Sequence, residues 1–147
     1  MGNLSATSTD LHVTCKGTLM DVRRAMFQVE RFMRDQNATG ELYDDLNLVL
    51  SEAMTNIARH GYPRDEGTIS FHLRLKPDAV ICRLTDHGIP YRPDALGLSS
   101  PEPGSFAEGG YGWFLIRSLT QTLAYSRSEG MNILDFTIPR RPESQQH

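Results

Sequence analysis

Ser51-Glu52-Ala53-Met54-Thr55-Asn56 is the most informative stretch of this chain for predicting its fold. It lies in the segment 41–59, whose apolar residues recur at three- and four-residue steps, so the segment is predicted to be a helix with one buried face. Gly61 follows and ends the helix. Glu52 and Asn56 are four residues apart, which stacks their side chains on one face, away from the centre of the apolar stripe.

The Glu52 and Asn56 pair has the chemistry for phosphoryl transfer. Mg²⁺ takes oxygen ligands and usually keeps several waters, so the amide oxygen of Asn56 can supply one ligand without adding negative charge. One helical turn earlier, Glu52 can accept a proton from an attacking hydroxyl or water. The alternative is a solvated helix face on which a glutamate and an asparagine stand by chance.

Two glycine-containing blocks come later in the chain. Asp86-His87-Gly88 ends a predicted strand, where the Asp86 carboxylate can accept the amino hydrogens of adenine and Gly88 lets a planar ring approach the backbone. A plain Asp-x-Gly turn is the alternative. Gly109-Gly110-Tyr111-Gly112 precedes a predicted helix, whose free N–H groups favour phosphate. Neither block fits a Walker loop, which needs a lysine among its glycines, or a Rossmann motif, which opens the first strand-helix unit.

The remaining pattern predicts one domain of alternating strands and helices. The expected strands are 11–16, 68–76, 79–84, 123–127 and 133–138, and the expected helices are 19–36, 41–59 and 111–122. The connection 88–109 is rich in Pro, Gly and Ser and longer than most connections in a compact domain, which is typical of a functional loop. We expect a disordered start at 1–10, a single domain at 11–140 and a flexible tail at 141–147.

Composition excludes several classes of protein. The 147 residues carry a formal net charge of -3, which gives no general attraction to nucleic acid. Cys15 and Cys82 are isolated, without the spacing of a metal site, and are predicted to be reduced thiols. No apolar stretch reaches the ~20 residues of a membrane span, and residues 1–10 lack the features of a signal peptide. These observations predict a cytoplasmic protein that binds neither membrane nor nucleic acid.

Taken in order, the blocks resemble the N, G1 and G2 boxes of the GHKL ATPase superfamily. The N box is matched by Glu52-x-x-x-Asn56, G1 by Asp86-x-Gly88 and G2 by Gly110-x-Gly112. Within that superfamily, the sequence around these residues most resembles the anti-sigma-factor serine kinases of bacterial partner switching, and the similarity runs from residue 11 to residue 140.

The resemblance implies a fold and a set of residue roles. The fold would be an α/β (α+β) two-layer sandwich of the Bergerat type, with a mixed sheet, helices packed on one face and a nucleotide lid at 97–108. The ligands would be ATP and Mg²⁺. The roles, carried over by motif position, are a catalytic base at Glu52, a magnesium ligand at Asn56, an adenine contact at Asp86, a base-pocket glycine at Gly88 and phosphate-loop glycines at Gly110 and Gly112.

The resemblance also implies partners. Proteins of this family bind a sigma factor, or bind a STAS-domain anti-anti-sigma factor and phosphorylate it on serine or threonine, and they often form homodimers. Two other functions stay open. One is a nucleotide-gated binding module without phosphotransfer, because nucleotide-binding residues and a catalytic acid are separable. The other is a fragment of a sensor histidine kinase, although too few residues precede Glu52 for a dimerisation helix pair with a phosphoacceptor histidine.

Overall fold

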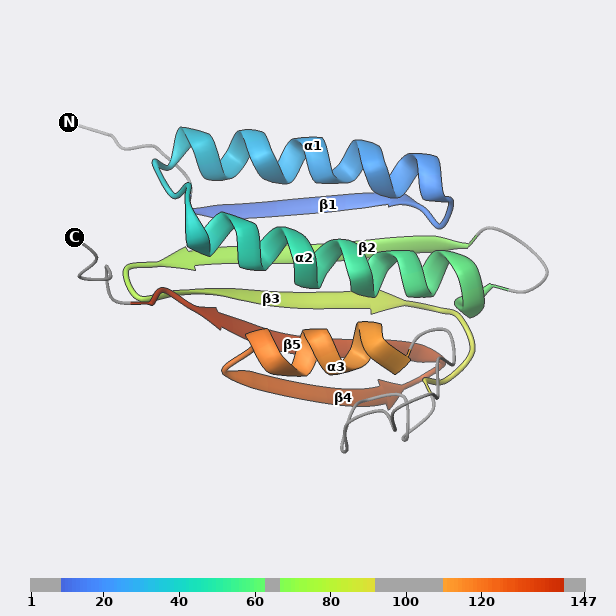
Figure 1. Cartoon of the computed structure of the whole chain (residues 1–147). Helices are drawn as coiled ribbons and strands as arrows, with labels where there is room; N and C mark the ends of the chain where they lie inside the picture. The colour runs from blue at the N-terminus through green and yellow to red at the C-terminus, as the bar shows by residue number, and fades with distance from the viewer. Residues whose placement is uncertain (1–8, 63–66, 92–109, 142–147) are drawn as a thin grey trace.

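The computed structural model describes residues 9–62, 67–91 and 110–141. The described elements are β1 (Asp10–Lys16), α1 (Leu19–Asp35), α2 (Glu41–Asn56), the π-helical turn η1 (Ile57–Gly61), β2 (Thr68–Lys76), β3 (Ala79–Asp86), α3 (Gly110–Leu119), β4 (Thr122–Ser128) and β5 (Met131–Pro139). Figure 1 shows two layers, with α1, α2 and α3 on one face of a single sheet. The expected two-layer α/β sandwich is therefore confirmed.

The sheet has the strand order β1-β2-β3-β5-β4, and every pairing among these strands is antiparallel. This corrects the expectation of a mixed sheet. The chain does run from β3 through α3 to a strand of the same direction, β4, but β5 lies between the two and pairs antiparallel with both (Figure 1). The two parallel strands thus never share hydrogen bonds.

The hydrophobic core lies between the sheet and the inner faces of the helices. On α1 the buried residues are Val22, Ala25, Val29, Phe32 and Met33, which recur along one face of the helix. Thr18 caps this helix, because its hydroxyl oxygen accepts a hydrogen bond from the Asp21 backbone N–H at 3.0 Å. The local sequence signals of α1 therefore agree with its three-dimensional packing.

The second helix ends differently from its prediction. Regular α-helix stops at Asn56, and the chain continues as the π-helical turn Ile57–Gly61 instead of reaching residue 59 as α-helix. The Gly61 carbonyl at the end of this turn accepts a hydrogen bond from the Ile89 N–H at 2.9 Å. A contact with a segment far along the chain therefore accompanies the wider turn, and such π-helical turns are frequent at functional sites.

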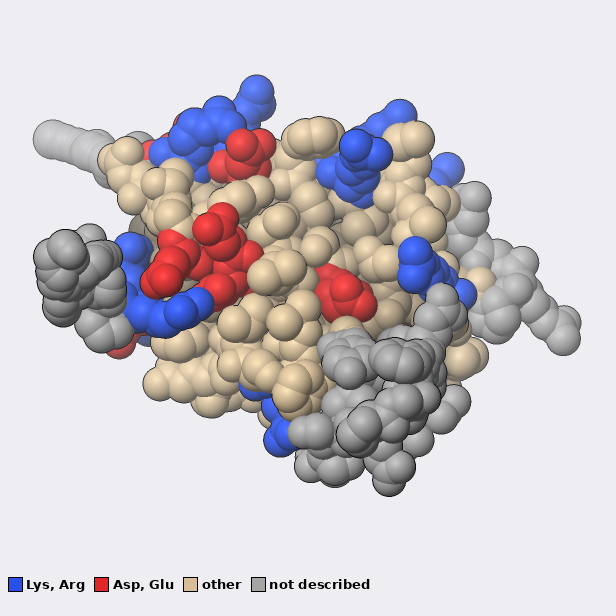
Figure 2. All heavy atoms as spheres, viewed as in Figure 1, with Lys and Arg blue, Asp and Glu red and all other residues tan. Residues whose placement is uncertain are grey.

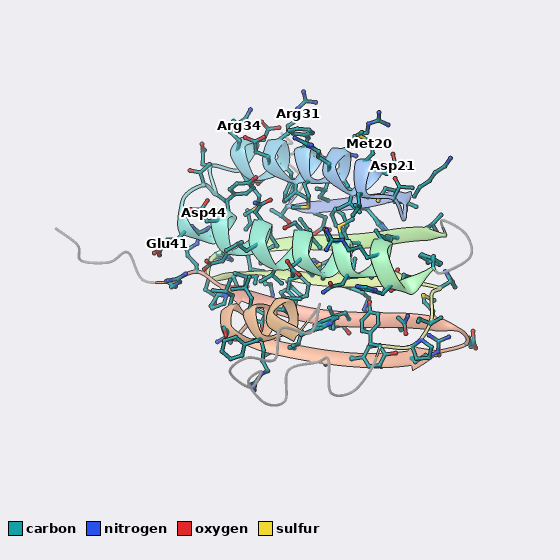
Figure 3. All side chains as sticks on the ribbon, turned by 45° about the vertical axis from the view of Figure 1, so that its right-hand side comes forward. Met20, Asp21, Arg31, Arg34, Glu41 and Asp44 are labelled. Carbon is teal, nitrogen blue, oxygen red and sulfur yellow. The ribbon has the colours of Figure 1, made fainter. Side chains whose placement is uncertain are left out.

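The outer surface of the helices carries charges of both signs. Figure 2 shows basic and acidic side chains interspersed over this face, and Figure 3 shows Arg31, Arg34 and Met20 projecting outward from α1. Arg141, which follows β5, forms ion pairs with Asp45 at 2.5 Å and Glu41 at 3.6 Å on α2.

None of the helices that the structure describes is long and apolar enough to cross a membrane.

Candidate functional site

Glu52 and Gly112 meet where α2 packs against α3. Glu52 is half-buried on the fourth turn of α2, and a β-carbon built on Gly112 would lie 2.2 Å from its Oε2 atom. No real side chain can stand that close, so only glycine allows the carboxylate to occupy this position. The first acid of the N box and the last glycine of G2, predicted from separate motifs, are therefore in contact.

Asn56 is the last residue of α2, one helical turn after Glu52. Its Nδ2 atom is buried and has no hydrogen-bond partner among the described residues. Buried amide groups are almost always paired, so an unpaired Nδ2 donor marks a position suited to a ligand that accepts a hydrogen bond, such as a phosphate oxygen. The described residues contain no group of three or more His, Cys, Asp or Glu that could hold a metal. A Mg²⁺ ion held largely by waters and phosphate oxygens does not need such a group, and the Oδ1 atom of the same amide is an oxygen ligand of the kind that Mg²⁺ takes.

Asp86 lies at the end of β3 and is only 1% exposed. Three donors hold its carboxylate: Oδ1 accepts from the Gly88 N–H at 2.7 Å and from the Asn132 side-chain amide at 2.9 Å, and Oδ2 accepts from the Tyr91 hydroxyl at 2.9 Å. Donors of this number and kind stabilise a buried carboxylate in a fixed orientation. Asp86 is therefore a rigid acceptor, as the recognition of an amino group requires.

Gly88 is required by backbone packing. A β-carbon on Gly88 would lie 2.4 Å from the carbonyl oxygen of Gly61, at the end of η1. The neighbouring Tyr62 hydroxyl accepts a hydrogen bond from the His87 N–H at 2.7 Å and donates one to the Thr68 carbonyl at 2.6 Å. The residues that follow the N box thus support the turn that carries Asp86.

Asn132 is a site residue that the sequence analysis did not identify. It is wholly buried on β5, and its side-chain amide donates to Asp86 and to the Ile89 carbonyl at 2.8 Å. Its Oδ1 accepts from the Tyr125 hydroxyl at 2.6 Å and from Arg127 at 2.8 Å. The predicted strand began at residue 133, but extending its alternation by one residue places Asn132 in the inward-facing register of the buried residues 134, 136 and 138.

Aromatic side chains pack beside Asp86. The Tyr91 ring stacks on Tyr125 with centroids 4.6 Å apart and lies 5.4 Å from the ring of Trp113 on α3. Burial and the neighbouring Asp86 carboxylate raise the pKa of the Tyr91 phenol well above its ordinary value. Tyr91 therefore remains protonated and keeps donating to Asp86.

The predicted site residues thus form two clusters, Glu52 with Gly112 and Asn56 on one side and Asp86 with Gly88 on the other. They are joined by the contact of η1 with Ile89 and by the contact of Trp113 with Tyr91. Gly110 is the first residue of α3, at its N-terminus. The predicted lid at 97–108 lies outside the described residues.

Comparisons with known proteins agree on one family. Residues 15–138 match the model of the histidine kinase-like ATPase domain. The chain is 32% identical over 108 residues to the serine-protein kinase RsbW of Bacillus cereus strain AH187, an alignment that covers 67% of each chain. It is 30% identical, with the same coverage, to the serine-protein kinase RsbW of Bacillus mycoides strain KBAB4.

A solved structure shares the fold. It contains the RsbU and RsbW domains of Rv1364c from Mycobacterium tuberculosis, and it matches with a TM-score of 0.65 at 20% identity, over 90% of this chain and 33% of that one. The fold and the arrangement of the boxes thus define a GHKL-type ATPase domain. The chain belongs to the histidine kinase-like ATPase family. Within it, the chain groups with the anti-sigma-factor serine kinases, as the resemblance predicted.

Proposed function

We propose that this protein is an ATP-dependent serine/threonine-protein kinase and anti-sigma factor, which binds a sigma factor and phosphorylates a STAS-domain antagonist. The observation that carries the proposal is the contact of the Glu52 carboxylate with Gly112. It brings the candidate base to the first turn of α3, where unpaired N–H groups favour phosphate. The RsbW relatives, which are named serine-protein kinases, support the same activity.

Each candidate residue has a distinct part in the proposed reaction. Asp86 accepts the amino hydrogens of adenine, with Gly88 beside it, and Gly110 and Gly112 lie along the phosphates. The oxygen of the Asn56 amide would hold Mg²⁺. When bound, this ion offsets negative charge on the phosphate oxygens.

Glu52 acts as the general base of the transfer. It takes the proton of the substrate serine or threonine hydroxyl as that oxygen attacks the γ-phosphorus of ATP, and the bond to the β-phosphate oxygen breaks to release ADP. The half-buried position of Glu52 against a glycine limits the freedom of its side chain, which favours one orientation of the carboxylate.

The test is transfer of labelled phosphate from Mg-ATP to a purified STAS-domain protein. We expect phosphoserine or phosphothreonine on that partner with the wild-type chain. Glu52→Gln should lower the rate at least about 100-fold and leave ATP binding intact, because it removes only the base. Asp44→Asn is the matched control, since Asp44 is an exposed carboxylate on the same helix (Figure 3) and should transfer phosphate normally.

Other results would point to other functions. Transfer that survives Glu52→Gln unchanged would contradict the proposed base. ATP-dependent affinity for a partner with no labelled product would favour the nucleotide-gated binding module. Phosphohistidine on the chain itself would favour a sensor kinase fragment.

A further inference from the structure

The Asp86 carboxylate has little acceptor capacity left. A carboxylate offers about four acceptor positions, two on each oxygen. Both positions of Oδ1 are taken, by the Gly88 N–H and the Asn132 amide, and the Tyr91 hydroxyl takes one position of Oδ2. An adenine amino group that binds Asp86 must therefore approach Oδ2, the oxygen that Tyr91 already contacts.

Because Asp86 is buried, an adenine amino group and the Tyr91 hydroxyl must compete for access to Oδ2. Asp86 is 1% exposed, so an incoming donor reaches Oδ2 only when one of its neighbours moves. Asn132 is wholly buried and fixed by contacts on both ends of its amide, and the Gly88 N–H belongs to the turn held against Gly61. Tyr91 is only half-buried. Of the three groups that donate to Asp86, its hydroxyl is the one carried by a partly exposed side chain that can rotate away.

We propose that the Tyr91 hydroxyl and the exocyclic amino group of adenine are alternative donors to Oδ2 of Asp86, so that Tyr91 sets the affinity and base selectivity of the site. The inference rests on the proposed role of Asp86 in reading adenine. Binding an adenine nucleotide exchanges one hydrogen bond to Oδ2 for another. A base with a carbonyl in place of the amino group, such as hypoxanthine, cannot make this exchange at that position, because it would set an acceptor against the carboxylate.

The test compares ADP with IDP by titration calorimetry on the full chain. Tyr91→Phe keeps the ring and its stacking on Tyr125 but removes the competing donor. We expect Tyr91→Phe to bind ADP about fivefold more tightly than wild type, the factor that one net hydrogen bond represents, and to show no gain for IDP.

Tyr43→Phe is the matched control. It removes a hydroxyl from a half-buried tyrosine on α2, whereas the donors to Asp86 are Gly88, Asn132 and Tyr91. Tyr43→Phe should therefore show no gain for ADP. A second readout needs no nucleotide: the unfolding midpoint of Tyr91→Phe should fall by about 2–4 °C, because Oδ2 loses its buried donor.

The outcomes separate this inference from the proposed function. ADP binding by Tyr91→Phe that is equal to or weaker than wild type would overturn the inference alone, as would an equal gain for IDP or an unchanged unfolding midpoint. If neither wild type nor Tyr91→Phe bound ADP, the proposed function itself would fail, and the competition at Asp86 would fail with it.

Discussion

The carboxylate of Glu52 and the α-carbon of Gly112 face each other across the contact between α2 and α3, so closely that a β-carbon on Gly112 would lie 2.2 Å from Oε2. Two motifs separated by some sixty residues therefore depend on one contact. The clash would fall on the far end of a flexible side chain, which can swing away. Fold and function should consequently respond differently to a substitution at Gly112.

Gly112→Ala should leave the protein folded and disable the transfer of phosphate. The added methyl displaces the Glu52 carboxylate, and a misplaced catalytic group can cost about 100-fold in rate. Stability should change by less than about 1 kcal/mol, because alanine is the better helix former and offsets the cost of moving Glu52. Urea unfolding and labelled transfer to a STAS partner measure the two effects.

A double variant shows whether Gly112→Ala acts through Glu52. If it does, Gly112→Ala combined with Glu52→Gln should transfer no more slowly than Glu52→Gln alone, since residues that act as a unit are not additive. A further loss in the double variant would mean that the alanine damages phosphate binding separately.

Local signals account for what the sequence could predict. The predicted helix 19–36 and the predicted strand 68–76 both depend on near neighbours, and their positions agree with the structure to within a residue. The boxes also placed Asp86 at the end of a strand and Asn56 one turn from Glu52.

Contacts between distant residues explain the rest. The π-helical turn accompanies the hydrogen bond from Ile89 to Gly61, and no local pattern encodes that bond. The position of β5 between β3 and β4 depends on sheet assembly and not on strand propensity. Asn132 lay one residue before the predicted strand 133–138, and a longer strand would have marked it, because a polar residue in an inward-facing register requires partners.

Asn132→Asp should destabilise the protein, and more so as pH rises. The donor that lies 2.9 Å from Oδ1 of Asp86 becomes a second buried carboxylate, and two such groups cannot both ionise at this distance. We expect a loss of at least about 2 kcal/mol in the free energy of unfolding at pH 7, measured with urea.

The sign of the pH dependence follows from the shared proton. The new pair raises the pKa of one carboxyl in the folded state above its unfolded value, so the deficit is smallest at acidic pH and grows as pH rises through the folded pKa. Gln28→Glu is the control, because Gln28 is an exposed amide within α1, and it should stay within about 0.5 kcal/mol of wild type. A deficit in Asn132→Asp that did not vary with pH would contradict the explanation.

Stability should also fall in alkaline solution because of Cys15. Burial, with a contribution from Asp21, raises the pKa of the Cys15 thiol from 9.0 to about 11. The folded state therefore holds this proton more tightly than the unfolded state, so the stabilisation is complete below pH 9 and is lost as pH rises toward 11. Urea unfolding of wild type should show this decline.

Cys15→Ala removes the titrating thiol and should make the decline between pH 9 and 11 shallower. Cys82, which is fully buried with its pKa also raised by burial, remains in this variant and retains its own alkaline contribution. Identical slopes for wild type and Cys15→Ala would show that Cys15 does not contribute.

Asn56→Ala should separate stability from metal-dependent binding. The Nδ2 atom of Asn56 is buried without a partner among the described residues, so its removal relieves an unfavourable desolvation. Alanine is also the better helix former. We therefore expect the free energy of unfolding to be no lower than that of wild type, measured by urea unfolding without nucleotide.

The effect of Mg²⁺ on ATP binding should be weakened by the same substitution. Mg²⁺ should tighten ATP binding to wild type. In the Asn56→Ala variant the factor by which Mg²⁺ tightens ATP binding should be at least about tenfold smaller, because the ion loses a protein ligand. Asn47→Ala, a half-buried amide on the same helix, should retain the magnesium effect. If Asn56→Ala were destabilised and kept its response to Mg²⁺, the buried amide would be a structural group. If Asn56→Ala were as stable as wild type or more stable, and lost the magnesium effect, Asn56 would be a ligand-binding residue. Its amide would then be an unpaired polar group that lowers the stability of the free protein.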